Sequence, residues 1–263
     1  MLFSDNAIIN AIIATFLAGF VATTLGAVPA FFLRRLNERL NNNLLSFAAG
    51  VMLAATIFSL LLPSIERLQQ TSASTSSAVL QAIAFLFLGG FILWAVNELV
   101  PHEHFEKGHE GTDVQSLRRI WLFVIAIAIH NFPEGMAVGI ANATDNMGTG
   151  LGATIGIGLQ NLPEGLSVAV ALQSQGYSKI YAFGVTALTG LIEVAGGIVG
   201  ASVLVISEHT LPWALAFAAG AMLFIVSDEI IPETHRTGFE SGATFSLFVG
   251  FGLMLFLDVV LTS

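Results

Sequence analysis

Two short motifs each place three possible metal ligands on one face of a helix. In the first motif, His130 and Asn131 precede Glu134 by four and three residues, so all three side chains share one helical face. The same spacing returns 30 residues later in a second set: Gln160, Asn161 and Glu164. Carboxylate, imidazole and amide groups suit a divalent metal of borderline to hard preference, such as zinc, cadmium, iron or manganese. Glu134 can serve both of its neighbours, and Glu164 occupies the same position in the second motif. Two adjacent metal ions bridged by these carboxylates would therefore fit.

A proline lies inside each motif. Pro133 and Pro163 each remove a backbone N–H, which frees the carbonyl oxygens of Ile129 and Leu159. Each kink therefore points the motif's side chains, together with backbone oxygen, into a polar cleft.

The composition around these motifs is that of a membrane protein. The chain has 263 residues, of which 55% are hydrophobic and 10% charged, whereas soluble domains carry about 25% charged residues. This excludes a soluble globular enzyme, a disordered protein and a coiled coil. The net charge of −9 disfavours a nucleic-acid partner. The absence of cysteine removes disulfides and thiolate ligands.

Eight stretches are long and apolar enough to span a bilayer as helices. We therefore predict an all-α, polytopic fold in a single transmembrane domain, residues 1–263, with no room for a soluble catalytic domain. The predicted spans are 7–33, 44–65, 78–100, 120–141, 148–172, 180–206, 211–231 and 243–261.

The basic residues predict the orientation of these spans. Eight of the nine fall in loops on one side, and only Arg67 falls on the other. By the positive-inside rule, the loops on the basic side are cytoplasmic and both termini lie outside.

Two internal repeats support a transporter. Residues 47–53 recur as 217–223 with six of seven positions identical, and each copy is followed by a proline, Pro63 or Pro232. With alternating spans, the two copies run in opposite directions, as do the two metal motifs. Inverted repeats with proline-interrupted helices are typical of secondary transporters. The alternative for the 47–53 pair is convergent packing of small residues.

Three glutamates lie within apolar spans without a basic partner: Glu134, Glu164 and Glu193. Each costs about 2.5–3.5 kcal/mol at a helix centre on insertion scales. No lysine or arginine occurs at matching depth. The partner of these carboxylates must come from outside the chain, as protons or as a metal cation. A purely structural role remains the alternative for Glu193.

The motifs at 130–135 and 163–165 resemble the signatures of the ZIP (Zrt/Irt-like) metal transporters, especially their bacterial branch. The resemblance extends over essentially the whole chain, including 47–59, 101–104 and 231–235. It implies eight helices in an inverted 3+2+3 arrangement around a binuclear metal site. It also implies a homodimer in the bacterial inner membrane that moves zinc and similar metals into the cytosol by elevator-type sliding.

Matched by position, the resemblance places the first metal ion at His130, Glu134, Gln160 and Glu164, with Met52 as a soft ligand. It places the second ion at Asn131, Glu134, Asn161, Glu164 and Glu193. Ser59 would lie on the outer side of the transport pathway. The inner exit would be lined by Asn97, His102, Asp228, Glu229 and His235. Many family members have His in place of Gln160, and close bacterial relatives have Asp in place of Asn161.

Two features keep two interpretations each, and Asp258 has one. The segment 101–117 contains His102, His104 and His109, and is either a cytoplasmic metal-receiving loop or a solvated polar loop. Met52 is either a ligand or ordinary helix packing. Asp258, near the predicted outer face, we interpret as interfacial solvation.

Two other function classes are weaker. An intramembrane metalloprotease would use His-Glu-x-x-His on one helix, and that sequence does not occur. A proton-coupled carrier of an organic anion would need a basic residue within the spans. We therefore expect no enzyme activity and no cofactor, with divalent metal ions as the transported substrate and the lipid bilayer as the surroundings.

Overall fold

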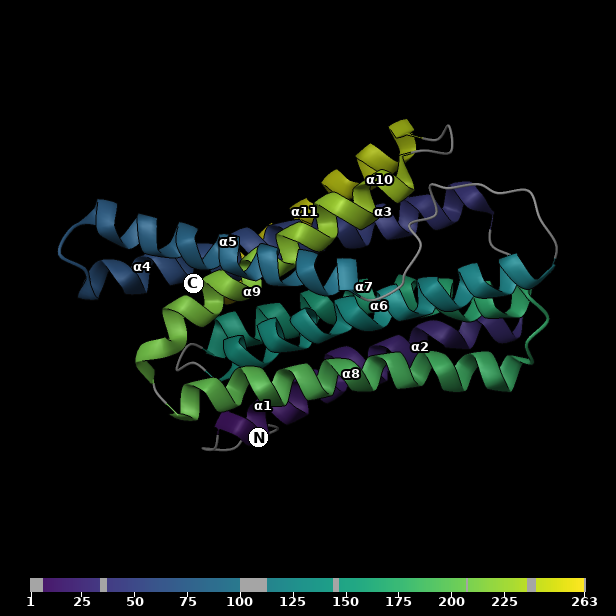
Figure 1. Cartoon of the computed structure of the whole chain (residues 1–263), viewed down its shortest axis with the longest axis horizontal. Helices are drawn as coiled ribbons and strands as arrows, with labels where there is room; N and C mark the ends of the chain where they lie inside the picture. Colours follow the sequence, from purple (N-terminus) through teal and green to yellow (C-terminus); the bar gives the residue numbers. More distant parts are fainter. Residues whose placement is uncertain are drawn as a thin grey trace.

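The chain folds into eight long helical rods, as a computed structural model shows (Figure 1). The structure describes residues 7–33, 37–99, 113–143, 147–206, 208–235 and 240–262. Three rods are interrupted by π-helical segments. The first rod consists of α1 (Ala7–Thr15), η1 (Phe16–Val21), α2 (Ala22–Ala27) and η2 (Val28–Phe31), and the second of α3 (Glu38–Ala54), η3 (Ala55–Leu61) and α4 (Leu62–Thr71). The seventh consists of α9 (Leu211–Ile225), η5 (Val226–Ile230) and α10 (Ile231–Thr234). The other rods are α5 (Thr75–Leu99), α6 (Asp113–Asn142), α7 (Met147–Ser174), α8 (Lys179–Ile206) and α11 (Glu240–Thr262); the short η4 (Glu208–Thr210) precedes α9.

Seven of the rods are long and apolar enough to cross a membrane, judged over the described residues. The eighth, α6, is 30 residues long, but many side chains of its first half lie outside the described residues. It packs between α1, α7, α8 and α9. The prediction of an all-α, polytopic membrane fold is confirmed. The second rod extends beyond the apolar stretch predicted at 44–65, because its polar first turn is capped by Asn37, which accepts a hydrogen bond from the Arg39 N–H at 3.0 Å.

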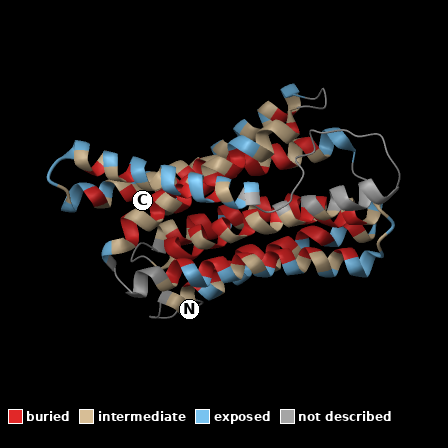
Figure 2. Cartoon of the chain, viewed as in Figure 1, coloured by how far each residue is buried: buried red, intermediate tan, exposed pale blue. Residues whose placement is uncertain are grey.

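The rods divide into two bundles by their closest packing. In bundle A, α6 packs most extensively on α8, and α7 packs on α2 and η1. In bundle B, α3 packs on α11, and α5 packs on α9. Contacts between the bundles run mainly from α7 to α3 and α11, and from α6 to α9. Buried residues line the facing sides of the rods, and the outward faces of α5 and α8 are exposed (Figure 2).

Glycines allow backbone to meet backbone inside each bundle. In bundle B, Gly250 abuts the carbonyl oxygen of Phe47 and Gly50 that of Leu247, so an added Cβ would overlap the neighbouring backbone. Between α5 and α9 the same arrangement recurs, with two more pairs: Gly89 with Phe217, and Gly220 with Leu86. Small residues at helix contacts are the usual means of close packing in membranes, where burial gives no hydrophobic gain between helices.

Bundle A is held in the same way. Gly135 abuts the carbonyl of Glu193, which brings α8 directly beside the first metal motif. Further contacts of this kind join α6 to α8 and α7 to α2, among them Gly196 with Phe132, Gly165 with Thr23, and Gly26 with Leu162. These close contacts therefore bring together the helices that carry the candidate ligands.

The internal repeat has the same local structure in both copies. After residues 47–53 the chain enters η3, and Pro63 is then the second residue of α4. After residues 217–223 it enters η5, and Pro232 is the second residue of α10. The glycine contacts also repeat with constant offsets in sequence, since Gly26–Leu162 and Gly196–Phe132 are related by 170 and 30 residues. These pairings match the predicted inverted 3+2+3 arrangement.

We expect Gly250→Ala to destabilise the fold by about 1–3 kcal/mol, because the new methyl group forces α11 away from α3. Thermal unfolding of purified protein in detergent measures the change. Gly252→Ala on the same helix is the control, since no atom lies within 4 Å of a Cβ there. It should be neutral, or stabilising by up to about 1 kcal/mol through helix propensity. Equal melting temperatures for the two variants would contradict the close α3–α11 packing.

Candidate metal centre

The structure buries every residue that the two motifs contribute. His130, Asn131 and Glu134 come from α6, and each is at most 4% exposed. The other predicted ligands are equally buried and come from α7, α8 and α3: Gln160, Asn161, Glu164, Glu193 and Met52. Glu134 interacts electrostatically with Glu164 and Glu193, and Glu164 interacts with His130. The four groups therefore share one buried region.

Several oxygen atoms in this region lack the hydrogen bonds that buried polar groups normally make. Glu134 and Gln160 interact with each other, but otherwise neither the carboxylate oxygens nor the amide atoms have a hydrogen-bond partner among the described residues. The same holds, within that part of the chain, for three further oxygens: Asn131 Oδ1, Asn161 Oδ1 and Glu193 Oε1. An unsatisfied buried acceptor costs about 1–3 kcal/mol, and more if charged. A cation would relieve this cost for the oxygen atoms.

The two asparagines are held so that only their amide N–H groups are used. Asn131 Nδ2 donates to the Thr189 carbonyl on α8 at 2.9 Å. Asn161 Nδ2 donates to the Ala18 carbonyl in η1 and to Glu193 Oε2, both at 2.7 Å. Such outer contacts orient a ligand and fix which atom faces the metal. Each asparagine thus keeps its oxygen for another partner.

His130 contacts a residue that the sequence analysis placed elsewhere. Its Nε2 lies 2.5 Å from Glu229 Oε2 in η5, a contact between bundle A and bundle B. We had predicted Glu229 for the inner exit alone. The internal repeat indicates a position on the pathway for Glu229, because this residue is the counterpart of Ser59 at an offset of 170 residues.

Acidic and histidine side chains alone do not complete a metal site in this conformation. Within the described ranges, no three His, Asp or Glu side chains are grouped so that they could hold a metal ion. A metal ion held here would therefore also need other donors, such as the amide oxygens of Asn131, Gln160 and Asn161. Met52 lies in a buried apolar cluster with Ala49 and Met222, an environment that packing alone explains.

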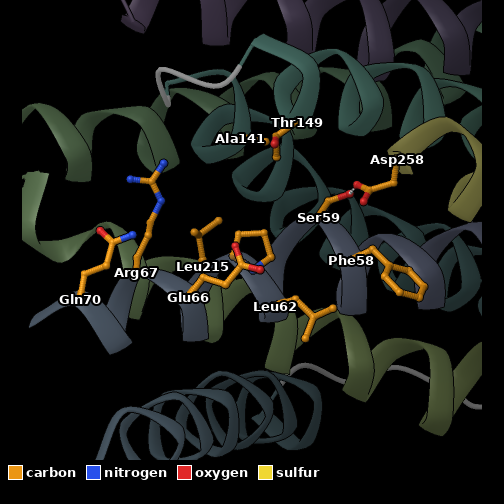
Figure 3. Close-up of a pocket in the computed structure, with 11 residues that line it drawn as sticks. Phe58, Ser59, Leu62, Glu66, Arg67, Gln70, Ala141, Thr149, Leu215 and Asp258 are labelled. Atoms are coloured by element: carbon orange, nitrogen blue, oxygen red, sulfur yellow. Dashed lines mark hydrogen bonds between the residues drawn. The ribbon is translucent and has the colours of Figure 1, made fainter. Parts of the chain in front are cut away.

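Ser59 opens onto a cavity of about 550 Å³ next to α4 (Figure 3). It donates a hydrogen bond of 2.7 Å to Asp258 Oδ1 from α11. Asp258 is only 8% exposed, so our interpretation of it as interfacial solvation was wrong. Glu66 and Arg67 add charge to the lining. The cavity lies toward the end of the molecule at which both chain ends lie in Figure 1.

Of the remaining predicted residues, two lie in or next to η5 and α10, and the side chains of the others lie outside the described part of the chain. Both ring nitrogens of His235 make contacts within bundle B. Nδ1 lies 3.0 Å from the Ile231 carbonyl oxygen, and Nε2 lies 3.1 Å from Thr244 Oγ1. Asp228 is exposed in η5. The Asn97 side chain and three histidines lie outside the described residues: His102, His104 and His109.

Comparison with known proteins gives consistent matches. The family described as ZIP Zinc transporter matches residues 97–258. The chain is 42% identical to Zinc transporter GufA of Myxococcus xanthus over 95% of this chain and 98% of that protein. It is 43% identical to Zinc transporter ZIPB of Bordetella bronchiseptica over 93% of this chain and 79% of that protein. Human Zinc transporter ZIP11 is 31% identical, over 98% of this chain and 99% of the human protein.

Replacing Glu134 by Gln should stabilise the metal-free protein by about 1–3 kcal/mol, because a neutral amide costs less to bury than a carboxylate without partners. The same variant should lose the rise in melting temperature that added metal gives the parent protein. Thermal unfolding with and without zinc measures both effects. Glu66→Gln, at an exposed position, should change stability by less than about 0.5 kcal/mol. A Glu134→Gln protein that zinc still stabilises would remove Glu134 from the site.

Proposed function

The chain belongs to the ZIP zinc transporter family, and on that premise we propose that it transports zinc and similar divalent metals, namely cadmium, iron or manganese. It is a multi-pass membrane protein and not an enzyme. The observation that carries the proposal is the group of buried oxygen atoms without hydrogen-bond partners, within the described residues, on α6, α7 and α8. Zinc is bound in proteins by imidazole and carboxylate groups, which His130 and the glutamates supply.

The proposed site is binuclear. The first metal ion would be held by His130, Glu134, Gln160 and Glu164, with Met52 approaching from α3. The second would be held by Asn131, Glu134, Asn161, Glu164 and Glu193. The anchored amide groups of Asn131 and Asn161 support this assignment, since their oxygens are the atoms left for a metal. Two metal ions beside a shared carboxylate would offset the repulsion between that carboxylate and the neighbouring ones.

The proposed route runs from the Ser59 cavity to the cytosol. Its lining includes the carboxylates of Asp258 and Glu66, which favour a cation. On the far side of the site, Glu229 contacts His130 from η5, and Asp228, the Asn97 position, His102 and His235 would follow toward the exit. The distribution of basic residues between the two sides supports an orientation in which the cavity and both chain termini face outside. The 101–117 segment would receive the metal in the cytosol.

We propose an elevator-type movement in which bundle A carries the metal past bundle B. Except for Met52, every proposed ligand belongs to bundle A. Backbone contacts at glycines join the helices inside each bundle, as at Gly135 and Gly250. Between the bundles lies a cluster rich in small and apolar side chains, among them Ala49, Ala137 and Ala219. Such a surface favours sliding over separation. As in the family, two copies would pair as a homodimer in the inner membrane.

We expect His130→Ala and Glu134→Ala each to reduce zinc uptake at least about 100-fold, because loss of a ligand weakens binding and leaves its neighbours unpaired. Uptake of zinc-65 into proteoliposomes measures the effect. Ser202→Ala is the control, since this serine only bonds the Ile198 carbonyl of its own helix at 2.6 Å. Uptake by the His130 and Glu134 variants at the parent rate would rule out this site. An organic substrate carried equally well by both variants would support the proton-coupled alternative.

Zinc affinity should fall at least about tenfold between pH 7.5 and pH 5. Metal ligation requires a neutral imidazole and ionised carboxylates, so protons compete with the metal as the pH drops. Calorimetric titration of purified protein with zinc at four pH values measures the dissociation constant. A dissociation constant that stays the same over this range would exclude the histidine and glutamates as ligands.

A further inference from the structure

One hydrogen bond outside the metal motifs joins the two bundles. Ser167 on α7 donates to Asn41 Oδ1 on α3 at 2.8 Å. By contrast, the bonds from Trp213 to Gln81 in bundle B and from Asn131 to Thr189 in bundle A each join helices of the same bundle. The Ser167–Asn41 contact therefore bears on how the bundles sit against each other.

The position of Ser167 connects this contact to the second metal motif. Ser167 follows Glu164 by one helical turn, and its Oγ also lies 2.9 Å from the carbonyl oxygen of Pro163. Its side chain is 6% exposed. A displacement of α7 along α3 would carry Glu164 with it and would separate Ser167 from Asn41.

The inverted repeat provides an internal comparison. The counterparts of Asn41 and Ser167, at offsets of 170 and 30 residues, are Leu211 and Ala137. Both are buried in one apolar cluster where α6 packs on α9. The equivalent positions of the other repeat are therefore apolar, so the repeat itself does not require polar side chains at Asn41 and Ser167.

We propose that the Asn41–Ser167 hydrogen bond is a latch that holds bundle A in the position seen here and that breaks once in every transport cycle. This inference rests on the proposed elevator movement and assigns a role to two residues outside the metal site. The latch biases the equilibrium between the two positions of bundle A, because its bond exists in one of them only.

A reversible cross-link tests the proposal directly, since the chain has no cysteine of its own. In the double variant Asn41→Cys with Ser167→Cys, a short thiol cross-linker should reduce zinc uptake by proteoliposomes at least tenfold, and a reductant should restore it. The control is Gln81→Cys with Trp213→Cys, two residues of bundle B joined by a bond of 3.2 Å. Cross-linking this pair should leave uptake unchanged. Undiminished uptake by the cross-linked Asn41–Ser167 pair would overturn the latch.

Substitutions of Ser167 in a labelled variant provide a readout that does not depend on zinc transport. Leu62→Cys lines the Ser59 cavity and reports its accessibility through the rate of maleimide labelling. Adding Ser167→Ala should change that rate at least twofold, whereas Ser167→Thr, which keeps the hydroxyl, should retain the parent rate. Identical labelling in the Ala and Thr variants would count against the latch.

Zinc binding separates this proposal from the proposed function. The cross-linked protein should still bind zinc, as calorimetry would measure. Retained binding would show that the loss of zinc uptake comes from blocked movement of bundle A. If the parent protein itself takes up no zinc, the proposed function fails, while the labelling rates still decide whether the latch exists.

Discussion

The structure depends on three carboxyl groups that the protein buries with no lysine or arginine within the same predicted spans. Glu134, Glu164 and Glu193 lie in the interior, and the only lysine or arginine between residues 120 and 206 is Lys179. Lys179 is at the start of α8 and donates to the Phe31 carbonyl. A membrane interior cannot supply water to satisfy such groups. In the proposed function, a metal cation takes the place of the missing partner and then leaves it.

Neutral amides make that exchange possible. Further carboxylates would bind a metal more strongly, but they would repel one another when the metal is gone. Gln160, Asn131 and Asn161 supply oxygen donors without adding charge. Asn161 also donates to Glu193 Oε2, so it stabilises a carboxylate while its own oxygen stays available. This division of roles within one side chain suits a site that must release its ligand.

Local sequence patterns predicted the fold and much of the candidate site, while contacts between distant segments escaped them. The i, i+3 and i+4 spacing around Glu134 identified buried residues, and the hydropathy pattern predicted the all-α membrane fold. The repeat at 47–53 anticipated a helix interrupted before a proline. The Ser59–Asp258 bond joins residues 199 positions apart, and the His130–Glu229 contact joins two bundles. Neither follows from spacing along one helix, although the 170-residue repeat offset relates Ser59 to Glu229.

The distribution of ligands over the two bundles gives the proposed movement its chemical meaning. If bundle A moves as one unit, the oxygen donors of α6, α7 and α8 stay together and travel with the metal. Met52 and Glu229 remain behind on bundle B, so the metal gains or loses their contacts as the position changes. His130 would then exchange Glu229 for the metal. A site completed by groups on the stationary bundle therefore has a different affinity at each end of the movement, which is what transport by alternating access requires.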